Sequence, residues 1–278
     1  MQIPWKLKSV AFSAIETMSA PGLLYFLQKH VTKRSRLNLT AVEANWELHR
    51  ENLASLDSPR LIEFGAGKNL RQNLYLSQWC ENQLVVDLNP MADLGQINDA
   101  ARQISAFVPG FDYRECASLS DVEREYGITY RAPYDMSETD LPDDSIDCCV
   151  STNTLEHIPE KSIVAIFSEL KRVLRIGGLV SAKIDYSDHY SHTDKTIGAL
   201  NFLQYEARDW ERYNHGNHYQ NRLRHYDFRR IFSSLGFVTE VDEPFFEGEK
   251  PPSLSSDFDA FDPTVYATGG YFRLRVQE

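Results

Sequence analysis

The spacing of hydrophobic and polar positions along the chain changes at Pro59. From there on, short apolar runs typical of buried strands alternate with stretches whose apolar residues recur every three or four positions, as on one face of a helix. The pattern predicts strands at 61–64, 84–87, 128–131, 146–151, 179–184, 237–241 and 270–276. It predicts helices at 71–80, 97–107, 121–126, 162–174 and 226–235. This alternation favours an α/β fold, here a doubly wound, mostly parallel sheet of seven strands with its last strand reversed.

Residues 1–57 precede this pattern and are expected to form an N-terminal helical segment, which leaves 58–278 as the main domain. A first helix is predicted within residues 1–20, because the apolar residues there share one face: Leu7, Val10, Ala11, Ala14, Ile15 and Met18. Further helices are predicted at 23–30 and 41–56.

The stretch 186–225 differs from the rest of the main domain. It is long for a connector and rich in His, Tyr, Asn and Arg. These properties favour an insertion on the substrate side that forms an acceptor pocket or a lid. A solvated insertion whose aromatic residues pack locally is the alternative.

Charge and composition limit the class of function. The net charge of -11 and the sequence pI of about 5.2 disfavour nucleic acid as a partner. The four cysteines show no C-x-x-C spacing, so we expect core cysteines in a cytoplasmic protein. Basic residues gather near the N-terminus, at Lys6, Lys8, Lys29, Lys33, Arg34 and Arg36. They raise the alternative of peripheral contact with an anionic membrane, against a first helix that packs on the core or covers the ligand site.

The sequence LIEFGAGKNL, at 61–70, leads an apolar strand into a turn with two closely spaced glycines. Gly65 and Gly67 permit positive φ and let a ligand approach the backbone. A dinucleotide site has a third glycine for helix packing beneath the pyrophosphate, and Leu70 stands at that position. Asp87 ends the next strand, where a carboxylate can accept hydrogen bonds from both hydroxyls of an adenosine ribose. The turn therefore favours an adenosine cofactor without a pyrophosphate.

A third informative segment is YDMSETDLPDDSIDCCVSTNTLEHIP, at 134–159. Together with the glycine turn and Asp87, it resembles class I S-adenosylmethionine-dependent methyltransferases, a Rossmann-like group that includes small-molecule enzymes. The resemblance covers 59–185, and the element order extends it over 226–278. It implies S-adenosyl-L-methionine as the cofactor, with Glu63 towards its amine and Asp135 towards its adenine. The cofactor-binding residues that it implies are Glu63, Gly65, Ala66, Gly67, Asp87, Leu88, Asp135, Met136 and Asn153.

Methyl transfer to a hydroxyl also needs a base that removes the hydroxyl proton. His189, just past the fifth predicted strand, is the preferred candidate, and Asp188 or Asp185 is expected to orient its ring. His157, after the fourth strand, is a second candidate, with a structural role at a helix start as its alternative. Asp185, Asp188, His189 and His192 include residue types that ligate metals, but their spacing is no recognised signature and no metal is expected.

These features favour a methyltransferase that acts on a small-molecule or glycan-like acceptor, at a hydroxyl oxygen. Two other classes stay open at this point. One is a non-catalytic module that binds an adenosine cofactor and docks a partner through its N-terminal helices. The other is an NAD-dependent oxidoreductase, which the missing third glycine disfavours.

Overall fold

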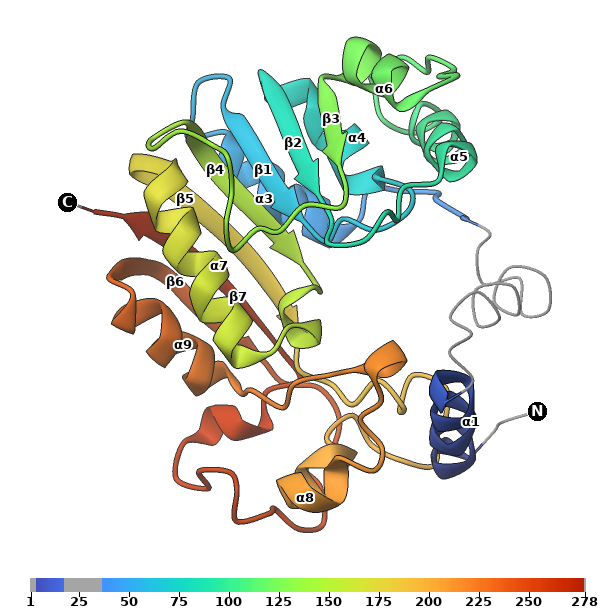
Figure 1. Ribbon diagram of the computed structural model, residues 1–278, viewed down its shortest axis with the longest axis vertical. Coiled ribbons are helices and arrows are strands. Elements are labelled where there is room, and N and C mark those ends of the chain that lie inside the picture. The colour runs from blue at the N-terminus through green and yellow to red at the C-terminus, as the bar shows by residue number, and fades with distance from the viewer. Residues whose placement is uncertain (1–3, 18–36, 278) are drawn as a thin grey trace.

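The chain is organised around one seven-stranded sheet (Figure 1). The structure is a computed structural model, and it describes residues 4–17 and 37–277. The strands are β1 (Arg60–Phe64), β2 (Asn82–Val86), β3 (Ile128–Arg131), β4 (Ile146–Thr152), β5 (Leu174–Asp185), β6 (Phe237–Phe245) and β7 (Gly269–Val276). Their order in the sheet is β3-β2-β1-β4-β5-β7-β6, with β1 to β5 parallel and β7 antiparallel to both of its neighbours. This confirms the predicted α/β class and the reversed last strand.

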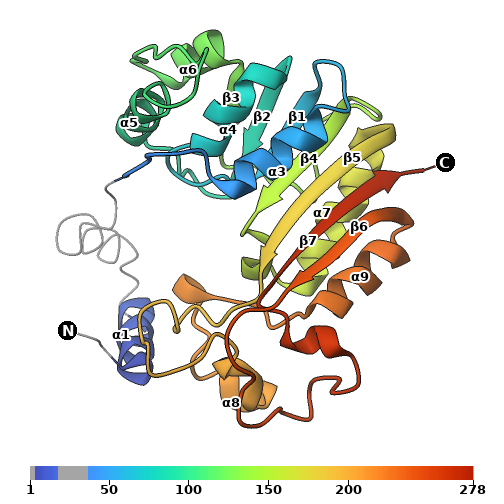
Figure 2. The same ribbon diagram turned by 180° about the vertical axis from the view of Figure 1, so that it is seen from behind.

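The described α-helices either cover a face of the sheet or lie beside the segment that follows β5. They are α1 (Trp5–Thr17), α3 (Ala44–Leu53), α4 (Arg71–Leu76), α5 (Leu94–Ile104), α6 (Leu119–Tyr126), α7 (Glu160–Val173), α8 (Ala207–Trp210) and α9 (His225–Ser234). Helices α7 and α9 pack on one face, and α3, α4 and α5 on the other (Figures 1 and 2). The helix predicted at 23–30 lies outside the described residues.

The two faces follow from the alternation of side chains along each strand. In β1, Ile62 and Phe64 join the core beneath α7 and α9, whereas Leu61 joins the core beneath α3 and α4. Glu63 shares the side of Leu61 and is therefore buried towards α4. Because β1 is central, its carboxyl end opens between the two helical layers, where open α/β sheets bind their ligands.

Helix α1 lies away from the sheet, against the residues that follow β5 (Figures 1 and 2). It buries Trp5 and Phe12 in an aromatic cluster with Tyr190 and Trp210. The prediction that the apolar stripe of this helix is its buried face was wrong, because Leu7 and Val10 are 62% and 65% exposed. The aromatic residues of the insertion pack instead against the face that carries Trp5 and Phe12. Ala11 is also exposed. The side chains of Ala14 and Ile15, Met18, and the basic residues 29–36 lie outside what the structure describes.

Within the described residues, no helix combines the length and the apolar character needed to cross a bilayer.

Candidate active site

The glycine turn after β1 has the backbone geometry that the sequence suggested. Gly65 and Gly67 both have a φ of 77°, in the left-handed region that glycine favours. A Cβ atom at Gly65 would collide with the side chain of Thr154, so that position accepts no larger residue. Leu70 also takes a left-handed φ, of 47°, at the start of α4. The turn can thus bring its backbone close to a ligand, and Gly65 packs closely against Thr154, which follows β4.

Two cavities meet at Gly65. The larger, of about 360 Å³, is lined by Asp87, Leu88, Asp135 and Met136, together with His157. The smaller, of about 160 Å³, is lined by Glu63, Ala66 and Asn153. The structure therefore gathers the predicted cofactor residues around one continuous site; Gly67 lies in the same turn but lines neither cavity.

The carboxylates of the larger cavity have different surroundings. Asp87 is 7% exposed, and its Oδ2 accepts a hydrogen bond of 2.7 Å from the Tyr130 hydroxyl. Burial raises the pKa of Asp87 to about 6. Asp135 is exposed, and hydrogen bonds from the Ser137 hydroxyl and backbone N–H lower its pKa. One carboxylate is thus fixed inside the cavity and the other stands at its rim.

Glu63 lies at the centre of a buried polar network. Its two oxygens accept hydrogen bonds from the side-chain amides of Gln72 and Asn73, at 3.0 and 2.8 Å. Burial raises the pKa of Glu63 to about 7. Thr152 links Gln72 to His49 of α3, which is fully buried. No sequence pattern pointed to His49, because its hydrogen-bond partners lie far along the chain, in β4 and β5.

Two histidines meet where β4 and β5 end. His157 lies in a short 3-10 turn after β4 (Leu155–His157), and His189 lies four residues after Asp185, the last residue of β5. Their ring centroids are 4.9 Å apart. His189 Nε2 lies 3.4 Å from Asp185 Oδ2. The side-chain oxygens of Asp188 instead accept hydrogen bonds from the Asn201 amide and the Tyr190 N–H, so Asp185 is the acid placed to orient His189.

Glu156 is a site residue that the sequence interpretation missed. It is 2% exposed, and neither carboxylate oxygen has a hydrogen-bond partner among the described residues. Burial raises its pKa to about 8. Only its position in the EHIP segment marked it, because its burial depends on residues distant in the sequence, such as Lys183 and Asp185 of β5.

The insertion holds this cluster through two adjacent amides. Gln220 Oε1 accepts the backbone N–H of His189, and Gln220 Nε2 donates to the carbonyl of Ser187. Asn221 Nδ2 donates to the carbonyls of Leu155 and Ile158, both at 2.7 Å. Residues 186–225 therefore position both histidines, which agrees with a pocket wall better than with a solvated connector.

Comparison with known proteins gives the class of the enzyme. Residues 62–182 match the family model described as a methyltransferase domain. No curated protein sequence matches the chain. Residues 62–182 therefore form a methyltransferase domain, and this match together with the sheet order supports the S-adenosylmethionine-dependent methyltransferase that the sequence predicted.

A solved structure agrees in fold. The chain is similar to a 1,6-didemethyltoxoflavin-N1-methyltransferase from Burkholderia thailandensis, with 14% identity, a TM-score of 0.51, and coverage of 100% of this chain and 92% of that one. It is also similar to the N-methyltransferase NodS from Bradyrhizobium japonicum, with 14% identity, a TM-score of 0.47, and coverage of 84% and 86%.

The residues present fit S-adenosylmethionine. Gly65 lines both cavities, an arrangement that suits a ligand with an adenosine end and an amino-acid end. The cofactor supplies an activated methyl group when bound, so the protein chiefly has to align the acceptor with it.

Proposed function

We propose that this enzyme methylates a hydroxyl oxygen of a small, hydroxylated or glycan-like acceptor, with His189 as the base. The observation that supports this most directly is the His189–Asp185 pair beside His157, which lines the cofactor cavity. Asp185 is placed to hold the ring of His189 and to stabilise its protonated form. Asp188 has no part in this pair, since its carboxylate is hydrogen-bonded elsewhere.

The acceptor in this proposal occupies a third cavity. It has a volume of about 420 Å³, and its lining includes Asn153, Lys183, Asp185, His192 and Lys195. Asn153 also lines the smaller cofactor cavity. A polar wall of this kind suits a hydroxylated acceptor better than a flat apolar one.

The proton balance of the step is simple. The acceptor oxygen forms its bond to the methyl carbon while the bond from that carbon to sulfur breaks, and the hydroxyl proton passes to a ring nitrogen of His189. His157 contributes to the wall of the cofactor cavity. The cofactor is held, in this proposal, by the residues named for it from the sequence, with the ribose on Asp87 and the adenine near Asp135.

Partners other than a small molecule have less support. The net charge of -11 disfavours nucleic acid. The buried face of α1 is occupied by the aromatic cluster and is not available to a bilayer. The four cysteines are unpaired, which suits a cytoplasmic enzyme.

The test is a labelled-methyl transfer screen over sugars, lipids and phenols, followed by substitution at the base. With the acceptor found, His189→Ala is expected to lower kcat by roughly 10²-fold to 10⁴-fold, while calorimetric affinity for the cofactor stays the same. His215→Asn is the matched control, because His215 is bonded to Ser9 and is no part of the His157–His189 pair. Equal turnover in wild type and His189→Ala would remove His189 from the mechanism.

A further inference from the structure

Two buried carboxylate oxygens in this site lack the partner that their chemistry requires. Within the described residues, both oxygens of Glu156 are buried without a hydrogen bond, and the buried Nε2 atom of nearby His189 makes no hydrogen bond and has only its 3.4 Å contact to Asp185 Oδ2. Buried polar groups are almost always hydrogen-bonded, because losing water without a replacement is costly. Unpartnered groups that gather in one place therefore point to a ligand.

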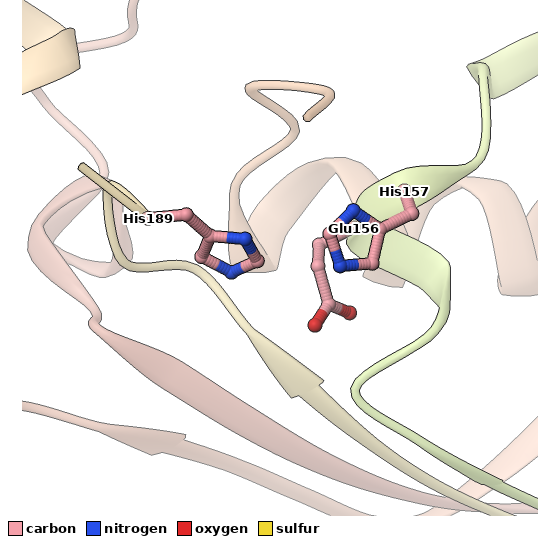
Figure 3. A group of neighbouring side chains, drawn as sticks. All are labelled: Glu156, His157 and His189. Carbon is pink, nitrogen blue, oxygen red and sulfur yellow. The ribbon is translucent and has the colours of Figure 1, made fainter. Parts of the chain in front are cut away.

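Glu156 and His189 face a common space with His157. One ligand atom from each of the three residues lies within 4.8 Å of the others. Figure 3 shows the carboxylate of Glu156 and the two imidazole rings turned towards the same gap. The edge of a zinc coordination tetrahedron is about 3.4 Å, so small side-chain rotations would close the set around an ion.

The tautomer of His157 also prepares it to bind a cation. Its Nδ1 lies 2.9 Å from the backbone carbonyl of Tyr219. A carbonyl only accepts, so Nδ1 carries the proton and Nε2 keeps its lone pair. Metal-bound histidines are oriented by this kind of hydrogen bond from the second ring nitrogen.

We propose that Glu156, His157 and His189 bind a divalent transition-metal cation of the zinc type. Two imidazoles and one carboxylate suit zinc and its transition-metal neighbours, whereas magnesium and calcium prefer oxygen ligands throughout. Asp185 and His192 lie next to His189 and form with it a second group that could hold a metal ion. The negative charge of Asp185 close to His189 also favours the binding of a cation there.

Occupation of the site has a consequence for catalysis, which rests on the proposed function. A lone pair of His189 that binds a metal cannot also take the proton of the acceptor. The bound ion therefore inhibits methyl transfer, and a chelator restores it. Binding itself does not depend on the identity of the acceptor or on the role of His189 as a base.

The experiment titrates the full, chelator-treated chain with Co²⁺ and follows the visible absorption of the bound ion, with Zn²⁺ as competitor. Wild type is expected to bind about one ion per chain. Glu156→Gln, which keeps the size of the side chain, is expected to weaken binding by at least roughly tenfold. His215→Asn should bind like wild type. Cofactor affinity measured by calorimetry on the same samples shows whether Glu156→Gln is folded.

Two results would overturn the site: no saturable Co²⁺ signal, or the same affinity in wild type, Glu156→Gln and His157→Asn. The activity arm is separate. Zn²⁺ should inhibit wild type and leave Glu156→Gln less affected, whereas turnover that falls on chelation would contradict the inhibitory role. A failed acceptor screen would weaken the proposed function and leave the Co²⁺ result intact.

Discussion

At the scale of single residues, Asp87 should make cofactor affinity depend on pH. In the proposed cofactor complex the ribose hydroxyls donate to its ionised form, and burial raises its pKa to about 6. Cofactor binding therefore favours loss of the Asp87 proton, and affinity should fall as pH falls below that value. We expect a loss of roughly fivefold between pH 6 and pH 5, because the ionised fraction of a group whose pKa is about 6 falls from about one half to about one eleventh over that unit. Calorimetry at a series of pH values from 5 to 7 measures it.

The control for this prediction is Asp87→Asn, which removes the titrating group and keeps the shape. Its affinity should be weaker than that of wild type by roughly tenfold to 150-fold at pH 7. Any pH dependence that remains in Asp87→Asn belongs to other groups, such as Glu63, whose pKa burial raises to about 7. Parallel pH profiles in the two proteins would show that Asp87 does not bind the cofactor as proposed.

Residues that follow the ends of neighbouring strands could be placed from the sequence, because parallel strands end at one edge of the sheet. Gly65, Asp87 and Asp135 reach one cavity for this reason. The sequence could not show whether Asp185 or Asp188 orients His189. The answer depends on hydrogen bonds of Asp188 inside the insertion, whose sequence has no periodic pattern from which to predict them.

At the scale of elements, all seven strands were predicted at the right places along the chain. In an α/β chain, apolar runs that lie between helical stretches are readily identified as strands. The bounds were less accurate where a strand continues past a glycine. Strand β5 begins at Leu174, and its register against β4 shifts before Leu179, so Gly177 lies inside the strand. The position of α1 in the sequence was predicted correctly, but its buried face was predicted wrongly. The face that a helix buries depends on the residues that it packs against, and here those belong to the insertion.

Trp5 is expected to hold α1 on the insertion. Its ring centroid lies 4.7 Å from that of Tyr213 and 5.4 Å from that of Tyr190, and its backbone N–H donates to Asp194. Trp5→Ala should release α1, because this much buried aromatic surface contributes about 3–5 kcal/mol. Faster limited proteolysis near the N-terminus and a raised KM for the acceptor are the expected measurements. Cofactor affinity should not change.

Leu7→Ala is the matched control on the same helix, since Leu7 is 62% exposed. It should alter proteolysis and KM little, as expected for a surface substitution. Identical behaviour of Trp5→Ala and Leu7→Ala would mean that α1 is not held through its aromatic face.

At the scale of the whole molecule, the site lies between two bodies of apolar packing. The sheet and its helices form one, and the aromatic cluster of α1 and the insertion forms the other. Arg224 joins them. Its fully buried guanidinium donates to the backbone carbonyl of Tyr186, which follows β5, and to those of Val265 and Ala267, which precede β7. Its position relative to the rings of Tyr186 and Phe202 adds cation–π contacts to both bodies.

Replacing Arg224 should therefore destabilise the protein and disorder the site together. Arg224→Met keeps an apolar side chain of similar length but leaves three buried carbonyls without a donor, and we expect a loss of about 3–5 kcal/mol in the free energy of unfolding. Arg212→Met is the control, because Arg212 pairs with Asp209 on the surface and is 67% exposed; such a pair contributes about 0–1 kcal/mol. Urea unfolding followed by tryptophan fluorescence measures both. A single transition shifted equally in the two variants would contradict this role, whereas an early second transition confined to Arg224→Met would show the insertion opening before the sheet, with His189 losing its contact to Gln220 as it does so.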